Sequence, residues 1–185
     1  MGSGPIRIFR GQSWGERLTQ TLKASELDEI SWMEQHTRLI KSDAYSRVGL
    51  FQFGGRLCYL KFYRAKSIGQ KMLFRLGYAR GVHSFDAALK LQQVEVRVPA
   101  PLTCIESPRG MMLLTEGVIE AKDLKALWHG AMEQSRQEQL LHSAGKALSR
   151  LHLAGYCHGD AKWSNWLWSG DDFYLVDLEG VKQVP

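Results

Sequence analysis

The first half of the chain carries short runs of apolar and β-branched residues that predict strands. The runs are TRLI at 37–40, RVGLFQF at 47–53 and LCYLKFY at 57–63. A Gly-Gly pair, Gly54 and Gly55, separates the last two runs and predicts a tight hairpin turn. We therefore expect a meander of three antiparallel strands.

Apolar residues at helical spacing then alternate with further strand-like runs. Residues 65–81 mix Lys and Arg with large apolar residues and predict one basic amphipathic helix, and 82–92 predict a second helix. Strands are expected around 97–105 and at 110–118, the latter buried. Residues 133–154 carry the apolar stripe of a long helix that Gly155 ends. A helix start is expected in SELDEISWME at 25–34 and a helix in AKDLKALW at 121–128. Strands at 166–168 and 173–176, joined by the turn SGDD, are expected to form a hairpin.

The order of these elements is β-rich first and helix-rich second, which predicts an α+β fold of two unequal lobes. The expected division is a short N-terminal extension at 1–36, a lobe built on an antiparallel sheet at 37–118, and a mainly helical lobe at 119–185 that is short or truncated.

Composition narrows the class of protein. The 24 Lys and Arg against 19 Asp and Glu give a formal charge of +5, which favours anionic partners such as nucleotides, nucleic acid or acidic membranes. The three cysteines form no CxxC pair, so neither a disulfide framework nor a zinc site is indicated. With no signal-peptide pattern and no apolar run of about 18 residues, we expect a cytoplasmic protein.

Four polar residues stand in an order that suits phosphoryl transfer. That chemistry needs a cation for the phosphates, a group that accepts or orients the hydroxyl proton, and ligands for a metal ion. Lys61 ends a strand-like run, Asp160 follows the long helix, Asn165 lies five residues further on, and Asp177 ends a later apolar run. A loop from Asp160 to Asn165 and the hairpin behind it would bring the last three together.

The motif LHxxGxxHGDxKxxN, from Leu151 to Asn165, and the run VDLEG ending at Gly180 resemble the protein-kinase-like fold. The details HGD, DAKWSN and VDLEG are most similar to the lipopolysaccharide kinase family, whose members phosphorylate Kdo or heptose sugars of the lipid A core. The resemblance implies a bilobal kinase fold over about residues 37–180, with ATP and Mg²⁺ as cofactors.

The resemblance also implies a role for each matching residue. Asp160 would be the catalytic base, with Lys162 at the γ-phosphate. Asn165 and Asp177 would bind Mg²⁺. Nucleotide contacts are implied for Lys61 at the α/β-phosphates, Glu116 and Val118 at the adenine, Asp123 at the ribose, and Leu167 beneath the adenine ring.

The sequence departs from the kinase pattern in four places. No GxGxxG precedes Lys61, and only a turn near 42–46 stands there, while Gly159 replaces the Arg of HRD. The helix has no Glu at the position where kinases place the partner of the strand Lys; Phe85 falls near that position and Asp86 is the nearest carboxylate. Only five residues follow Gly180. These departures keep two alternatives open: a pseudokinase or binding module of envelope assembly, and a kinase of small molecules or protein Ser/Thr.

Three further features allow two interpretations each. His158 is expected to hold the loop rather than carry protons. Trp163, Trp166 and Trp168 suit either core packing, which the alternation favours, or stacking on a sugar or nucleic acid. Residues 65–81 suit either a solvated helix face or peripheral contact with anionic lipid or glycolipid at the inner membrane face. Nucleic acid is not an expected partner, since no binding motif accompanies the charge.

Overall fold

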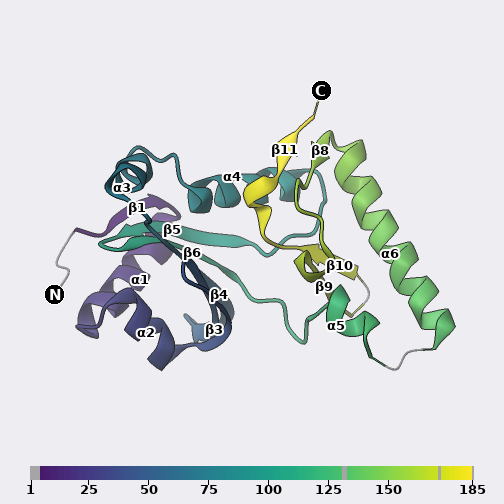
Figure 1. Ribbon diagram of the computed structural model, residues 1–185, viewed down its shortest axis with the longest axis horizontal. Coiled ribbons are helices and arrows are strands. Elements are labelled where there is room, and N and C mark those ends of the chain that lie inside the picture. The colour runs from purple at the N-terminus through teal and green to yellow at the C-terminus, as the bar shows by residue number, and fades with distance from the viewer. Residues whose placement is uncertain (1–4, 131–132, 171, 185) are drawn as a thin grey trace. The chain divides into compact units, whose positions relative to one another are not determined.

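The computed structural model describes residues 5–130, 133–170 and 172–184. It divides into two compact units. Figure 1 shows the ribbon of the chain with most of its helices and strands labelled. Unit 1 comprises Met1–Phe85 and Pro101–Gly117, and unit 2 comprises Asp86–Ala100 and Val118–Pro185. The chain passes from unit 1 to unit 2 after Gly117, one residue before the expected lobe boundary after residue 118. Residues 86–100, which were expected in the sheet lobe, belong to unit 2.

Unit 1 is built on a six-stranded antiparallel sheet in the order β1-β5-β6-β4-β3-β2. Its strands are β1 (Arg7–Arg10), β2 (Arg38–Ser42), β3 (Ser46–Phe53), β4 (Arg56–Arg64), β5 (Pro101–Ser107) and β6 (Gly110–Glu116). The predicted meander of β2, β3 and β4 is confirmed. Gly54 and Gly55 form its second turn with φ of 61° and 79°, a backbone conformation that glycine adopts without strain.

The N-terminal segment is packed into unit 1 and is not a mere extension. Strand β1 pairs with β5, and α1 (Gln12–Ala24) buries Leu18 and Leu22 against the sheet. Helix α2 (Glu29–His36) starts later than the Ser25 signal predicts. The Asp28 carboxylate caps it by accepting hydrogen bonds from the amides of Ile30 and Ser31 at 3.0 and 3.1 Å.

The prediction of one helix over 65–81 is wrong, because Gly77 divides the segment. Helix α3 (Ile68–Arg75) ends before it and α4 (Arg80–Gln93) begins after it. Gly77 has a φ of 81°, and the amides of Gly77 and Tyr78 donate to the carbonyls of Phe74 and Leu73. This is the Schellman closure in which a left-handed glycine ends a helix.

Unit 2 contains the predicted long helix and hairpin. Its elements are β7 (Lys122–Asp123), α5 (Leu124–Trp128), α6 (Gln134–Leu153), β8 (Tyr156–Cys157), the 3₁₀ turn η1 (Trp163–Asn165), β9 (Trp166–Ser169), β10 (Asp172–Leu175), the 3₁₀ turn η2 (Leu178–Gly180) and β11 (Lys182–Gln183). Strands β10, β9 and β7 form one antiparallel sheet, and β11 pairs with β8. Asp171, in the predicted turn SGDD, lies outside the described residues.

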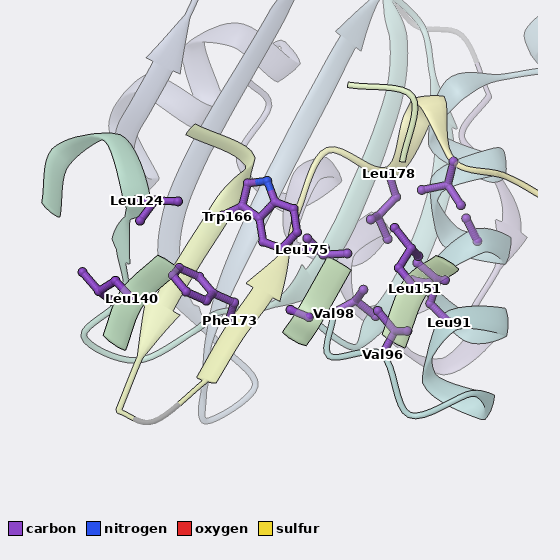
Figure 2. Close-up of a cluster of buried hydrophobic side chains, with 14 residues drawn as sticks. Leu91, Val96, Val98, Leu124, Leu140, Leu151, Trp166, Phe173, Leu175 and Leu178 are labelled. Carbon is purple, nitrogen blue, oxygen red and sulfur yellow. The ribbon is translucent and has the colours of Figure 1, made fainter. Parts of the chain in front are cut away.

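One apolar core holds unit 2 together. Figure 2 shows Trp166 and Phe173 of the hairpin near Leu140 of α6, with Leu91 and Leu151 in the same cluster. Trp166 is buried, and Trp168 packs on Phe173 with ring centroids 4.9 Å apart, so core packing is confirmed for these two tryptophans. The core fixes both ends of the hairpin that lies between Asn165 and Asp177.

Within the described part of the chain, the structure contains no helix that is both long and apolar enough to span a membrane.

Candidate active site

The segment from Tyr156 to Asn165 forms a loop between β8 and β9 that His158 anchors. This side chain is buried, its Nε2 donates to the carbonyl of Val176 at 2.9 Å, and its Nδ1 accepts from the amide of Asp160 at 3.4 Å. Both ring nitrogens are therefore engaged with the backbone. The expected structural role of His158 is confirmed, and the histidine ties the loop to the strand that precedes Asp177.

Two glycines let the loop approach the DLEG segment closely. Gly159 has a φ of 74°, and a Cβ added there would lie 2.4 Å from the carbonyl oxygen of Gly180. A Cβ at Gly180 would in turn lie 2.9 Å from the carbonyl oxygen of His158. No side chain fits at position 159. The close approach to Gly180 therefore explains why glycine stands here in place of the arginine of HRD.

Asp160 is held by two neighbours in the loop. The ammonium of Lys162 lies 2.6 Å from Oδ2 of Asp160, and the amide nitrogen of Asn165 donates to the same oxygen at 3.2 Å and to the Asp160 carbonyl at 2.9 Å. Asn165 is buried, whereas half of the Asp160 side chain is exposed. Because Asn165 uses its Nδ2 on Asp160, its Oδ1 is left as an acceptor.

These contacts perturb the ionisation of the pair. The hydrogen bond from Lys162 is the main reason why the pKa of Asp160 lies below its usual range, and the negative charge of Asp177 acts in the opposite direction. The bond to Asp160 likewise raises the pKa of Lys162, with smaller contributions from Asp177 and Glu179. Asp160 is therefore a carboxylate and Lys162 an ammonium at neutral pH.

Asp177 follows β10 in an unusual conformation. Its φ and ψ are 62° and 53°, the left-handed region that non-glycine residues rarely adopt. The residue before it, Val176, donates its amide to the carbonyl of Asn165 at 3.0 Å. The backbone thus fixes Asp177 relative to Asn165, and strain of this kind is common at functional sites.

Four of the predicted site residues of unit 2 are thus linked at this loop. The charges of Asp160, Lys162 and Asp177 influence one another, and Asn165 bonds to Asp160. Sequence reasoning missed Glu179, whose charge also acts on Lys162. Its place in VDLEG, two positions after Asp177, could have indicated that it lies near the site.

The metal-ligating prediction involves one carboxylate and one amide. Among residues 5–130, 133–170 and 172–184, no three His, Cys, Asp or Glu side chains form a cluster that could hold a metal ion. Asn165 and Asp177 offer two hard oxygen donors, which is the donor chemistry that Mg²⁺ takes when water and substrate phosphates complete its shell.

The residues predicted to contact the nucleotide are divided between the units. In unit 1, Lys61 lies on β4 opposite Val48 and Leu113, with its ammonium 4.9 Å from the ring centroid of Tyr63. Glu116 ends β6 and forms an ion pair with Arg56. In place of a glycine-rich loop, the turn between β2 and β3 is ordered by Asp43, whose carboxylate accepts from the amides of Tyr45 and Ser46 at 2.8 and 2.7 Å.

The remaining three predicted contacts belong to unit 2. Val118 is buried, and Leu167 of β9 lies opposite Asp123 of β7 in their short ladder. Asp123 also caps α5, since its Oδ1 accepts from the amide of Ala126 at 2.7 Å. The structure brings Asp123 and Leu167 together, and it gives Asp123 a structural role that was not among the sequence predictions.

A search of curated proteins finds no match. A solved structure, described as WaaP in complex with acyl carrier protein, matches with a TM-score of 0.56 and 19% sequence identity over 85% of this chain and 68% of that chain. This likeness shows that the mixed fold of helices and antiparallel sheet is shared.

The model of one protein family matches residues 30–183, which include the Asp160 loop and the DLEG segment. The chain belongs to the lipopolysaccharide kinase (Kdo/WaaP) family, and it is thus a kinase of the lipopolysaccharide core.

Proposed function

We propose that the protein transfers the γ-phosphoryl group of Mg-ATP to a hydroxyl of an inner-core sugar, Kdo or heptose, at the cytoplasmic face of the membrane that carries the glycolipid. The proposed fold is the bilobal protein-kinase-like one, with unit 1 as the N-terminal lobe and unit 2 as the C-terminal lobe. The observation that carries the proposal is the hydrogen-bonded group of Asp160, Lys162 and Asn165 on one loop, with the charge of Asp177 acting on it.

In this proposal Asp160 accepts the proton of the attacking hydroxyl. Its carboxylate is half exposed and ionised at neutral pH, so it can reach an acceptor and take up a proton. Lys162 holds Asp160 in place and offers its charge to the transferring phosphoryl group. Asn165 Oδ1 and the Asp177 carboxylate would hold Mg²⁺, which supplies charge neutralisation of the phosphates when bound.

The nucleotide contacts follow the family resemblance. We assign Lys61 to the α/β-phosphates, the backbone at Glu116 and Val118 to the adenine, and Leu167 to the adenine face. Asp123 is assigned to the ribose through its Oδ2, because its Oδ1 caps α5.

Two variants test these roles. Asp160→Ala should abolish phosphoryl transfer and keep ATP binding, whereas Asp177→Ala should also lose the Mg²⁺-dependent part of ATP binding. Both are checked by thermal-shift titration with ATP, with and without Mg²⁺, and by transfer of labelled γ-phosphate. Unchanged turnover in either variant would contradict the assignment.

The same experiment tests the alternatives. A wild-type protein that binds Mg-ATP and phosphorylates none of the acceptors would be a pseudokinase or binding module. Labelling of a soluble small molecule or a protein Ser/Thr in place of the core glycolipid would instead support a kinase of another acceptor class.

We also propose that helix α3 contacts the anionic surface of the membrane that carries the substrate. Ile68 and Met72 of the helix and Leu76 at its C-cap follow at four-residue intervals on one face and are 82%, 61% and 69% exposed. Tyr78 just beyond is 75% exposed, whereas Phe74 is buried and attaches the helix to unit 1. Exposed apolar residues gathered on one helix are typical of an interaction surface.

The charge around this face is complementary to anionic lipid. Between residues 57 and 85 the sequence contains no Asp or Glu, while Lys66 and Lys71 flank the apolar residues. Arg75 on the same helix forms an ion pair with Glu106 at 3.5 Å. Lys66 lies over the ring of Tyr45, 3.8 Å from its centroid, and Tyr45 is itself exposed. Basic residues beside an exposed apolar face are the pattern of helices that lie in the membrane interface.

Binding to vesicles tests the membrane contact. With vesicles of 30% phosphatidylglycerol in phosphatidylcholine, Lys71→Gln should weaken binding about fivefold, at about 1 kcal/mol per cation. Ile68→Glu should weaken binding further. Leu153→Glu is the matched control, because Leu153 is 86% exposed on α6 in unit 2. Equal binding by Ile68→Glu and Leu153→Glu would refute the contact.

A further inference from the structure

Of Trp163, Trp166 and Trp168, for which core packing was predicted, only Trp163 lies outside the apolar core of unit 2. Trp166 is 5% exposed, whereas Trp163 is 41% exposed. It lies in the stretch from Gly159 to Ser164, all of which is exposed and which is bounded by the buried His158 and Asn165. The indole is thus presented to solvent three residues after Asp160 and directly after Lys162.

The Trp163 ring is held in place. The indole of Trp128, at the end of α5, packs against it nearly edge to face, with ring centroids 5.1 Å apart and planes at 72°. The backbone is fixed as well, because the Asn165 amide donates to the Lys162 carbonyl at 2.8 Å and the Trp166 indole nitrogen donates to the Ala161 carbonyl at 3.2 Å. An aromatic pair of this geometry stabilises the orientation of both rings.

A rigid exposed indole beside a carboxylate base suits a pyranose ring. The C–H face of a sugar is apolar and weakly positive, and it packs on the negative face of an aromatic ring, while the hydroxyls at the sugar edge stay free for polar contacts. A sugar seated on Trp163 would lie at the same exposed stretch of the loop as Asp160 and Lys162, which are both half exposed.

From this geometry we propose that Trp163, supported by Trp128, is the platform on which the ring of the acceptor sugar stacks. The inference rests on the proposed function for the identity of the ligand, since a sugar acceptor is what it assigns to the Asp160 loop. Trp163 would then be a specificity residue that acts through acceptor binding, while the phosphoryl transfer remains with Asp160.

Steady-state kinetics with core glycolipid as acceptor provide the first test. Trp163→Ala should raise KM for the acceptor about fivefold to tenfold, with KM for ATP unchanged, and Trp163→Phe should keep most of the wild-type affinity because it retains an aromatic face. Leu153→Ala, which truncates another exposed apolar side chain of unit 2, should change neither constant. An unchanged acceptor KM in Trp163→Ala, or a parallel rise in KM for ATP, would overturn the proposal.

Direct binding separates this inference from the proposed function. Saturation-transfer NMR with the methyl glycoside of Kdo, and separately of heptose, should show contact of at least one sugar with the wild-type protein and with Asp160→Asn, and loss of that contact in Trp163→Ala. Sugar contact without phosphoryl transfer would refute the proposed function and leave the platform standing. Transfer that proceeds with equal sugar contact in Trp163→Ala and wild type would refute the platform alone.

Discussion

Substitution of Gly159 by alanine should destabilise unit 2 by considerably more than an ordinary glycine substitution. Two costs add at this position. A residue with a Cβ at a φ of 74° costs about 1–2 kcal/mol. The new Cβ would also lie 2.4 Å from the Gly180 carbonyl oxygen, so the loop and the DLEG segment must move apart, which costs about 1–3 kcal/mol more.

The expected loss is therefore about 2–5 kcal/mol in the free energy of unfolding, or about 4–20 °C in Tm for a chain of this size. Gly155→Ala is the matched control, because Gly155 has a φ of 78° but its added Cβ would lie 3.8 Å from the nearest atom outside its chain neighbours. The control should lose only about 1–2 kcal/mol. Urea denaturation followed by circular dichroism measures both, and equal losses in the two variants would refute the argument that close approach requires Gly159.

Three further predictions concern single side chains. His158→Ala should lower the free energy of unfolding by about 1–3 kcal/mol, since it leaves the Val176 carbonyl without its bond; a loss below about 0.5 kcal/mol in urea denaturation would contradict this. Asp28→Ala should cost about 1 kcal/mol through loss of the α2 cap. Because the cap lowers the pKa of Asp28, its contribution should be complete above the unfolded-state pKa of about 3.9 and should disappear as the pH falls through the folded-state pKa; a pH-independent difference in stability from Asp28→Ala would count against it. Lys162→Met should raise the pKa of Asp160 towards its usual value, as measured by ¹³C NMR of the carboxyl group, and an unmoved pKa would show that Lys162 is not its main cause.

Local patterns were enough to predict the strands of the meander, the long helix α6 and the hairpin of β9 and β10. Each of these elements is determined by residues close together in the sequence. Gly77 was also a local signal, but the amphipathic pattern on both sides of it concealed the break between α3 and α4. A helix or strand was therefore predictable wherever the apolar periodicity and the position of glycine indicated the same boundary.

Other features depend on contacts between distant residues. The pairing of β1 with β5 joins Arg7 to Glu106, and no local pattern indicates such a partner. The close approach of Gly159 to Gly180 and the exposure of Trp163 likewise depend on how the chain folds back on itself. The motif from His158 to Asn165 was readable from the sequence because its residues are adjacent, whereas the pairing of Asp123 with Leu167 was not, because 44 residues separate them.

The central claim is that the Asp160 loop phosphorylates a sugar of the lipopolysaccharide core. The most direct test is transfer of labelled γ-phosphate from Mg-ATP to extracted core glycolipid lacking its phosphate, with identification of the labelled hydroxyl by mass spectrometry. Label is expected on a Kdo or heptose hydroxyl with the wild-type protein and none with Asp160→Asn. A folded wild-type protein that binds Mg-ATP but leaves the glycolipid unlabelled, or an Asp160→Asn variant that labels it at the wild-type rate, would contradict the claim.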